Sequence, residues 1–586
     1  MSPNAMPGWA RPIRIPERIE ITHAEPAFAI AGEKSTWRLP FRLSKAVPAG
    51  AILKCQLWGG RNNKGAFAGA QTERREAEGH LAAELDDGMV LAMSPDKKRG
   101  TYVVSLPDAG LKKGQGLTVV LGSRAHGGGG ITAWRERMLN KFFILYSVPT
   151  EEAEPKFPAW AGGDVWAQGT DDRIVAACTM HILGGATHHI RAYVPATTRP
   201  GVPFAVLVRP EDESGCLSHQ ELAAVDISVN GQLLRADMER IPESTSLWAT
   251  VRLPAEGVHR LSVREGASGR EAVTNPTICA RTAQPVYWGM IHGHTEMSDG
   301  TGKLDHYFHQ LRHEVMLDFA APGDHDHLWE TSDEFWATTC AAVRFWHQPH
   351  EFVTFLGYEW AKWRRNGDGD RNVYYLEDDR PLYRSDDGEY PSPPDLFRAL
   401  TGKQEKAVVI PHHTGHGGNF CDWKDHGPAH ERLVEIFQTR GSYECSEQDG
   451  NPSPERAGGP APYTDGYVRR ALSLGWRVGF TAGGDDHSGH WGTEFRFGPN
   501  GKGYKQGLMS VEAAEKTRQA IFEAMHNRRV VATTGARMLL TYTLNGHPMG
   551  SELSVKSTPG LAVRRTLSIA FHGTAVVSRI DIIRSN

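Results

Sequence analysis

The sequence predicts a multidomain protein of the α/β plus β class. Its 586 residues exceed what one hydrophobic core normally serves, so several domains are expected. Short runs that alternate apolar and polar residues fill positions 20–280, as in β-domains. From 285 to 536 the apolar runs alternate with helical patterns, as in a parallel α/β barrel or sheet.

Two β-domains are expected before this segment. Residues 1–155 contain alternating runs at 51–58, 101–106 and 117–121, separated by Gly, Pro and Asp clusters that favour turns. A break near 155–158 separates residues 1–155 from residues 156–284. Strand patterns at 203–208 and 258–263 predict a second, β-sandwich-like domain there.

The segment 285–536 is expected to form one α/β domain. Apolar runs predict strands, and apolar spacing near 3.6 residues predicts helices. The strand candidates are 317–321, 352–356, 407–410, 433–437 and 477–481, and the helix candidates are 305–314 and 511–527. Acidic or histidine residues follow each strand candidate directly. Residues 537–586 are expected to be a C-terminal β segment, to which further β-structure could have been attached.

Composition argues against two classes of partner. Lys and Arg total 65 against 69 Asp and Glu, with no long single-sign run, so a nucleic-acid surface is not expected. No apolar run approaches the roughly 18 residues of a membrane span.

Seven scattered cysteines and an N-terminus without an apolar core favour a cytoplasmic protein. A chain cut behind a removed signal would look the same, which leaves a periplasmic location open.

Potential metal ligands gather at the predicted strand ends. His292 and His294 lie one residue apart after an apolar run, so both imidazoles can point to one side of a strand end and reach one ion. In a barrel of parallel strands, the carboxyl ends converge on one mouth, where distant residues can share an ion. Further ligand-type residues are Asp299, His325, Glu359, His412, Glu435, Asp485 and His487.

This set resembles the polymerase and histidinol phosphatase (PHP) superfamily. The resemblance rests on His292-Gly293-His294-Thr295-x-x-Ser298-Asp299-Gly300, Asp324-His325, the strand-end Glu359, His412 after a strand, and Asp485-x-His487. It covers about 285–536 and implies a distorted (β/α)7-type barrel with hydrolase activity. The closing run 528–535 and the flanking β-regions look more like a large branch that includes hydrolases of aryl and oxime carbamates.

The resemblance also implies the ligand set. The resemblance implies that one metal is bound, or bridged to a second, by His292, His294, Glu359 and Asp485. The remaining metal sites would be completed by His325, His412 and His487, with Asp299 nearby. Two or three divalent ions are implied: zinc, manganese or iron. The mixed nitrogen and oxygen ligands suit all three. Two choices of ligand stay open. One is between Glu435 and Glu444. The other is between His412 and His413, because adjacent strand residues face opposite ways.

Other residues near the strand ends are candidates for catalysis and binding. His413, His416 and Asp326 are acid–base candidates, although Asp324 and Asp326 could instead orient imidazoles. Tryptophans after the strand ends favour an aromatic-lined pocket for an apolar or aromatic substrate; they are Trp329, Trp360, Trp363, Trp423 and Trp491. Lys362, Arg364 and Arg371 could bind a phosphate, although such runs are more often solvated loops.

The expected function is hydrolysis. A hydroxide held on a metal ion would cleave a carbamate or carboxyl ester with an aryl-type leaving group. The expected partner is a small ester-type substrate, with substrate contacts from Trp360, Lys362, Trp363 and Arg364. Homo-oligomerisation stays open. The alternatives are a phosphomonoesterase or phosphodiesterase, and a non-enzymatic β-sandwich binding protein with a structural metal site.

Overall fold

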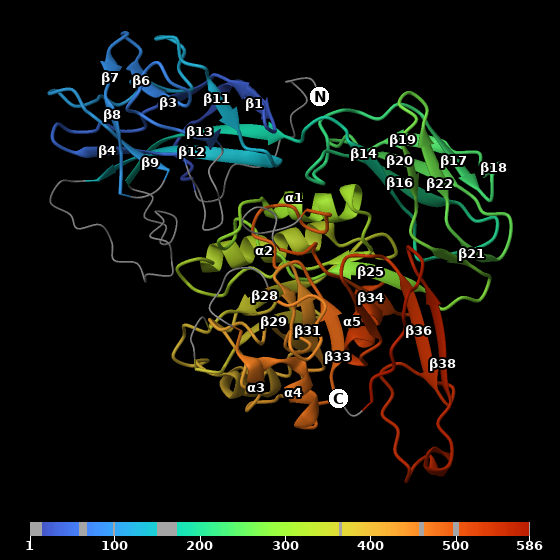
Figure 1. Ribbon diagram of the computed structural model, residues 1–586. Coiled ribbons are helices and arrows are strands. Elements are labelled where there is room, and N and C mark those ends of the chain that lie inside the picture. The colour runs from blue at the N-terminus through green and yellow to red at the C-terminus, as the bar shows by residue number, and fades with distance from the viewer. Residues whose placement is uncertain are drawn as a thin grey trace.

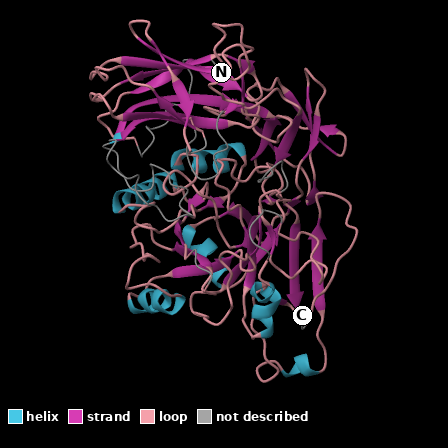
Figure 2. Cartoon of the chain, turned by 60° about the vertical axis from the view of Figure 1, so that its left-hand side comes forward, coloured by secondary structure: helices cyan, strands magenta, loops and turns pink. Residues whose placement is uncertain are grey.

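A computed structural model describes residues 15–57, 67–97, 100–148, 173–362, 366–455, 462–495 and 503–584. Figure 1 shows two groups of β-strands at the top of the molecule and a mixed unit with helices below them. A C-terminal sheet, in red, stands beside the mixed unit. Strands dominate the described part of the chain, and Figure 2 shows only a few short helices.

The first β-unit is built on a ten-stranded sheet. Its strands are β1 (Ile21–Ile30), β2 (Lys34–Ser35), β3 (Trp37–Arg42), β4 (Ile52–Gln56), β5 (Phe67–Ala68), β6 (Leu81–Leu85), β7 (Val90–Leu91), β8 (Met93–Pro95), β9 (Thr101–Val104), β10 (Gly116–Leu121), β11 (Ile131–Ala133), β12 (Met138–Val148) and β13 (Ile174–Leu183). The large sheet has the order β7-β6-β10-β3-β1-β13-β12-β4-β9-β8, and β2-β11-β5 form a second sheet.

Alternation along β3 shows why this sequence forms a half-buried strand. Trp37, Leu39 and Phe41 are buried in the core of the unit, and the arginines between them are exposed. Strand β13 lies beyond the boundary expected at residue 155. It nevertheless pairs with β1 and β12, so the first sheet extends to Leu183.

The second β-unit consists of three small sheets. Its strands are β14 (His189–Tyr193), β15 (Thr197–Thr198), β16 (Phe204–Glu211), β17 (Val225–Val229), β18 (Gln232–Leu233), β19 (Asp237–Arg240), β20 (Leu247–Val251), β21 (Gly257–His259), β22 (Ser262–Glu265), β23 (Glu271–Val273) and β24 (Thr277–Cys279). The sheets have the orders β14-β16-β20-β19, β15-β24-β21 and β18-β17-β22-β23.

Buried charges join the β-units to the mixed unit. The Arg137 guanidinium donates to both oxygens of Glu314, at 2.8 and 3.1 Å. Burial alone would raise the pKa of Glu314, but Arg137, together with His306 and His309, lowers it to about 2. The Arg537 guanidinium lies 4.2 Å from the ring centre of Tyr193, a cation–π contact.

In the described residues, the mixed unit contains eleven strands and five α-helices. The strands are β25 (Val286–Met290), β26 (Phe319–Ala320), β27 (Val353–Thr354), β28 (Leu356–Trp360), β29 (Asp370–Tyr375), β30 (Ala407–His412), β31 (Leu433–Gln438), β32 (Gly441–Ser442), β33 (Gly479–Ala482), β34 (Leu508–Glu512) and β35 (Val530–Thr533). The helices are α1 (Leu304–His309), α2 (Asp333–Trp346), α3 (Pro393–Gly402), α4 (Val468–Ser473) and α5 (Arg518–His526).

The prediction of a distorted (β/α)7-type barrel is wrong. The strands form three separate sheets, β27-β26-β25-β34-β35, β28-β29-β30 and β32-β31-β33. In the first sheet β25 pairs parallel with β26 and antiparallel with β34, and the second sheet is antiparallel throughout. A (β/α) barrel needs a crossover between successive parallel strands. The consecutive strands β28 and β29 pair antiparallel, so these two strands are not a parallel pair joined by a crossover.

Two helix predictions need correction. The candidate at 511–527 combined two elements, because Val511 belongs to β34 and α5 begins only at Arg518. The Thr517 side chain accepts a hydrogen bond from the Ala520 N–H and so fixes this start. The candidate at 305–314 is the short helix α1 followed by a π-helical turn, Gln310–Glu314.

The C-terminal segment forms a small antiparallel sheet of order β37-β36-β38. Its strands are β36 (Leu539–Leu544), β37 (His547–Pro548) and β38 (Leu567–His572). None of the helices in the described part of the chain has the length and apolar character that a membrane span requires.

Candidate metal centre

Single backbone bridges tie the strand ends together where the predicted ligands lie. Gly293 bridges to Asp486, and His325 bridges to Glu359. The His294 N–H donates to the Asp486 carbonyl at 2.9 Å, and the Asp485 N–H donates to the His292 carbonyl at 3.0 Å. These contacts bring side chains from four separate sequence segments next to one another.

Three groups of potential ligands result. Within each group, one nitrogen or oxygen atom per residue lies within 4.8 Å of the others. The groups are His292, His294, Glu359 and Asp485; His294, Asp299, His325 and His487; and Glu359, Asp370, His412 and His413. The first and second share His294, and the first and third share Glu359. All members are buried except Asp299, which is half-buried.

The first group surrounds Glu359 and Asp485. Nε2 of His294 lies 3.2 Å from Oε2 of Glu359 and 3.2 Å from Oδ1 of Asp485. Nε2 of His292 lies 3.4 Å from the same glutamate oxygen. Four ligand atoms converging from the segment after β25, from β28 and from the loop after β33 form an arrangement that suits one divalent ion.

The second group surrounds Asp299. Its Oδ1 lies 3.2 Å from Nε2 of His487 and 3.5 Å from Nδ1 of His325. The rings of His294 and His487 stack with their centres 3.9 Å apart. Burial and the nearby His294 lower the pKa of His487 to about 3, so this imidazole is neutral and able to bind metal.

The third group contains a residue that was not predicted from the sequence, Asp370. It lies opposite His412 in the pairing of β29 with β30, and its Oδ2 is 3.6 Å from Nε2 of His413. Nε2 of His412 lies 3.3 Å from Oε1 of Glu359. The φ of +31° at His413 interrupts the alternation of the strand, so the alternatives His412 and His413 both lie in this group.

Unsatisfied ring nitrogens indicate that these groups fit metal ions. Within the described part of the chain, Nε2 of His292, both ring nitrogens of His294 and Nε2 of His412 have no hydrogen-bond partner, although all three side chains are buried. Leaving such atoms unpaired costs about 1–3 kcal/mol each. Divalent zinc, manganese or iron would satisfy them, because imidazole and carboxylate suit these ions.

The charges in the centre favour the same ligands. Burial would raise the pKa of Glu359, but the nearby imidazoles of His412, His325, His292 and His294 hold it well below its ordinary value. Burial would lower the pKa of His292, but Glu435 and Glu359 raise it overall. Glu359 therefore stays ionised, and the carboxylates around His292 favour a positive charge in the centre.

Several neighbours orient the ligands. Nδ1 of His292 lies 3.1 and 2.9 Å from the two oxygens of Glu435. Glu435, which was predicted as a ligand, therefore contacts the imidazole of His292 and belongs to none of the three groups. The alternative, Glu444, pairs with Arg469 at 3.3 Å and is also outside them. Asn372 contacts Nδ1 of His412 at 3.2 Å.

The acid–base candidates have different surroundings. Nδ1 of His416 lies 2.5 Å from a carboxylate oxygen of buried Glu455, and its ring centre lies 5.7 Å from that of His413. The carboxylate of Asp326 accepts hydrogen bonds from Ser385 and Ala361. Burial raises the pKa of Asp326 to about 6, and these contacts suit a structural role.

Most of the predicted substrate contacts are not accessible. Trp360, Trp423 and Trp491 are fully buried, so they pack in the core and do not line an open pocket. The Nζ of Lys362 donates to the Pro391 carbonyl. Trp363 and Arg364 lie outside the described residues. Arg371 is buried, and its Nε donates to Glu431 at 2.8 Å.

Arg440 is a cation at the centre that was not predicted from the sequence. It lies between β31 and β32, and its guanidinium donates to Oδ2 of Asp485. Gln438 donates to the same oxygen at 2.6 Å. The charge of Arg440 also contributes to lowering the pKa of both His413 and His487. No strand pattern marks this residue, because it lies in the turn.

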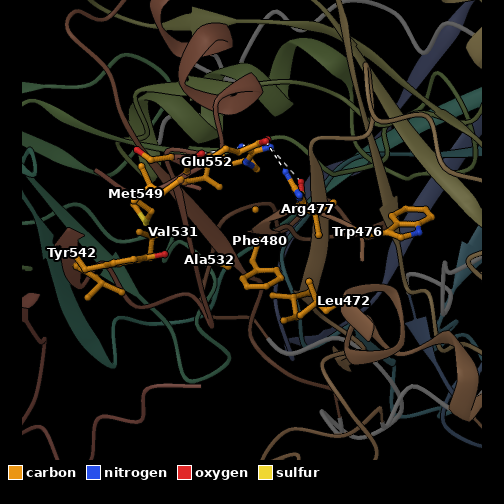
Figure 3. Close-up of a pocket in the computed structure, with 18 of the residues that line it drawn as sticks. Leu472, Trp476, Arg477, Phe480, Val531, Ala532, Tyr542, Met549 and Glu552 are labelled. Carbon is orange, nitrogen blue, oxygen red and sulfur yellow. Dashed lines mark hydrogen bonds and ion pairs between the residues drawn. The ribbon is translucent and has the colours of Figure 1, made fainter. Parts of the chain in front are cut away.

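A large cavity lies elsewhere in the mixed unit. It encloses about 1030 Å³ between β33, β35 and the C-terminal sheet. Figure 3 shows Leu472, Trp476 and Phe480 on one side of it and Tyr542 and Met549 on the other, with the Arg477–Glu552 ion pair at its edge. Its described lining includes no member of the three ligand groups, so the cavity is separate from them.

Comparison with known proteins relates the chain to uncharacterised proteins. A family model described as "Protein of unknown function (DUF3604)" matches residues 305–452 and 498–565. An uncharacterised protein of Chlamydia pneumoniae is 26% identical over 583 residues, covering 97% of this chain and 90% of its own length. A protein of Chlamydia muridarum is 25% identical with the same coverage.

Two adhesin structures illustrate the matches among solved structures. The Escherichia coli adhesin FdeC is 12% identical at a TM-score of 0.19, over 46% of this chain and 68% of that one. Yersinia pseudotuberculosis InvD is 11% identical at 0.21, over 46% and 62%. At such TM-scores neither structure informs the function of this chain.

Proposed function

We propose that the chain is a metal-dependent hydrolase that holds two or three divalent ions in the buried groups and cleaves an ester-type bond. The observation that carries the proposal is the overlap of the three groups through His294 and Glu359. Shared ligands allow neighbouring ions to act on one bond. The order and spacing of the motifs, which resemble the PHP superfamily, support the same function.

Glu359 is the residue best suited to join two ions. Its Oε2 faces His292 and His294 at 3.4 and 3.2 Å, and its Oε1 faces His412 at 3.3 Å. Divalent ions there would lower the pKa of water and polarise the scissile group. The buried surroundings exclude bulk water, which strengthens every charge interaction in the centre.

His416 is suited to move the proton that the leaving group needs. Glu455 accepts from Nδ1, which leaves Nε2 as the atom that exchanges a proton with a substrate. The side chain of His416 is 17% exposed, so a substrate can reach it. Because nucleophilic Ser or Cys is not required, the absence of a Gly-x-Ser-x-Gly motif in the sequence agrees with this route.

The first candidate bond is a carbamate or carboxyl ester, as the resemblance to the carbamate-hydrolase branch implies. The burial of Trp360, Trp423 and Trp491 removes most of the independent support for an aryl leaving group. A phosphoester is the second candidate. Arg440 favours it, because a guanidinium beside the centre suits an oxyanion.

The test uses the metal-free protein and three chromogenic substrates. Para-nitrophenyl butyrate, para-nitrophenyl N-methylcarbamate and para-nitrophenyl phosphate are assayed before and after adding zinc, manganese or iron. Metal-restored cleavage of the ester or carbamate is expected, and cleavage of the phosphate alone would replace the first candidate by the second.

A pair of variants separates an enzyme from a binding protein with a structural metal site. His294→Ala should abolish the activity, and His547→Ala, at an exposed position of β37, should not. If His294→Ala lowers the melting temperature but metal-loaded wild type cleaves none of the three substrates, the hydrolase proposal fails.

A further inference from the structure

The cavity between β33, β35 and the C-terminal sheet has no part in the proposed hydrolysis. Its volume of about 1030 Å³ lies at the upper end of the range of about 300–1,000 Å³ that is usual for small-molecule pockets. Its described lining is separate from the three ligand groups. The cavity is therefore a candidate for a second binding site.

The walls of the cavity are mainly apolar. Figure 3 shows Leu472 and Phe480 on one side and Tyr542 on the other. Leu472 and Phe480 are half-buried, and Tyr542 is 39% exposed, so the two sides do not cover one another. Apolar walls that stay uncovered favour an apolar occupant, because each methylene group that leaves water contributes to binding.

Three arginines gather at the edge of this cavity around one carboxylate. Oε1 of Glu552 accepts from Arg528 at 2.8 Å, and Oε2 accepts from Arg477 at 2.9 Å. Nη2 of Arg432 lies 3.8 Å from Oε1 of the same glutamate. We call Arg432, Arg477 and Arg528 the arginine group.

The charge of the arginine group is not balanced. Within the described residues, Glu552 is the acidic side chain that pairs with each of its three members. Glu431, the chain neighbour of Arg432, pairs instead with Arg371 at 2.8 Å. Three guanidinium groups and one carboxylate leave a surplus of two positive charges. Burial and the nearby Arg528 accordingly lower the pKa of Arg432.

Arg477 is the member of the group that can bind an anion. It belongs to the lining of the cavity, and its side chain is 74% exposed. Among the described residues, only its Nη1 donates to a partner, Glu552. The remaining N–H donors form a planar fork that matches a carboxylate. Arg528, in contrast, also donates to the carbonyls of Arg477 and Gly550 and so supports the fold.

We infer that this cavity binds a long-chain carboxylate, with the apolar chain between the C-terminal sheet and β33 and β35, and the carboxylate at Arg477. An apolar space with surplus positive charge at its edge is complementary to a molecule that is apolar along its length and negative at one end. The inference does not depend on the proposed hydrolase function, because the site is separate from the metal centre.

Calorimetry on the full chain tests the binding, with decanoate, hexanoate and 1-decanol as probes below their aggregation concentrations. Each buried methylene group should contribute about fourfold in affinity, so decanoate should bind at least about tenfold more tightly than hexanoate. Decanoate should also bind more tightly than decanol. No saturable binding of decanoate, or affinity that is equal to that of either other probe, would overturn the inference.

A cavity-filling variant tests the location. Ala532 lines the cavity in β35, so the indole of Ala532→Trp would occupy the space and should abolish decanoate binding. The control Ala341→Trp adds the same side chain at an exposed position of α2 and should bind as wild type does. Binding by Ala532→Trp with wild-type affinity would place decanoate elsewhere and overturn the inference.

Variants of the exposed charges test the carboxylate position without filling the core. Arg477→Gln should weaken decanoate about threefold and leave decanol unchanged, since an exposed ion pair contributes modestly. Arg398→Gln is the matched control, because Arg398 is also 74% exposed and pairs with one carboxylate at 2.9 Å. Glu552→Gln should strengthen decanoate binding, because it removes the one negative charge of the group. Weaker binding in Glu552→Gln, or a loss in Arg477→Gln that is equal for decanoate and decanol, would contradict the inference.

The competing occupant of the cavity is a second copy of this chain. Sedimentation velocity should give wild type and Ala532→Trp the same oligomeric state, with and without decanoate. If wild type self-associates and Ala532→Trp does not, the cavity is an interface between copies and the inference fails.

Discussion

Asp370 lies directly opposite His412 in the antiparallel pairing of β29 with β30, and it adds a carboxylate to the third ligand group. The carboxylate is held firmly, because it accepts hydrogen bonds from the Lys362 N–H at 2.6 Å and from Asn419 at 2.7 Å. An orientation fixed in this way suits a metal ligand.

Replacing Asp370 by Asn should remove one ion from the centre. The amide keeps the size of the side chain but loses the charge that binds a divalent ion. We expect the metal content to fall by one ion per chain relative to wild type, measured by elemental analysis after dialysis. Asp395→Asn, at the partly exposed start of α3, is the control. An unchanged metal content would exclude Asp370 as a ligand.

Glu435→Gln should weaken metal binding and leave the fold intact. Glu435 accepts from Nδ1 of His292, and its charge makes the other ring nitrogen a better ligand. Loss of such a partner typically costs about 10–100-fold in metal affinity. Chelator competition should show this loss of metal affinity in Glu435→Gln. The control Glu444→Gln, which affects the pair with Arg469, should keep the metal affinity of wild type. Equal effects of the two variants would contradict the orienting role.

The sequence predicted much of the centre because its motifs stand directly at strand ends. His292, His294, Glu359 and Asp485 come together because each lies near or just after the end of a buried strand, and single bridges tie those ends. The pairing of strands could not be predicted. Buried runs such as β30 contain the same apolar residues whether they pair parallel or antiparallel, so the barrel prediction failed.

Residues in turns and at strand ends were also beyond sequence reasoning. Asp370 follows a glycine-rich turn, and Arg440 lies in the turn after β31, where no periodicity indicates a direction. Trp360 was expected to line a loop but is the last residue of β28 and is buried. Tertiary packing decides which of these side chains face the centre.

Breaking the buried pair of Arg137 and Glu314 should destabilise the junction of the first β-unit with the mixed unit. Arg137→Met leaves a fully buried carboxylate unpaired, and removal of one partner of such a pair costs about 3 kcal/mol. Urea unfolding at pH 7 measures the loss. Arg312→Met, which affects an exposed pair with Glu351, should cost less than about 1 kcal/mol.

The same pair gives a pH dependence of defined sign. Arg137, with contributions from His306 and His309, lowers the pKa of Glu314 from the ordinary 4.5 to about 2 in the folded protein. A carboxylate whose pKa is lower in the folded than in the unfolded protein stabilises the fold at pH values above its unfolded-state pKa. The contribution of Glu314 to the free energy of unfolding is therefore complete above about pH 4.5 and is lost as the pH falls towards 2. The stability gap between wild type and Arg137→Met should therefore narrow over this range. A constant gap would exclude the ion pair as its cause.

Replacing His416 by Gln should slow hydrolysis most for poor leaving groups. The imidazole bound to Glu455 can protonate a departing alkoxide, and general acid catalysis contributes about 10²–10⁴-fold. Para-nitrophenolate leaves without a proton, so kcat should fall little for para-nitrophenyl butyrate and strongly for ethyl butyrate. Glu455→Gln should show a weaker form of the same pattern, and His547→Gln should show neither effect. An equal fall in kcat for both esters would indicate that His416 positions the substrate and does not transfer the proton.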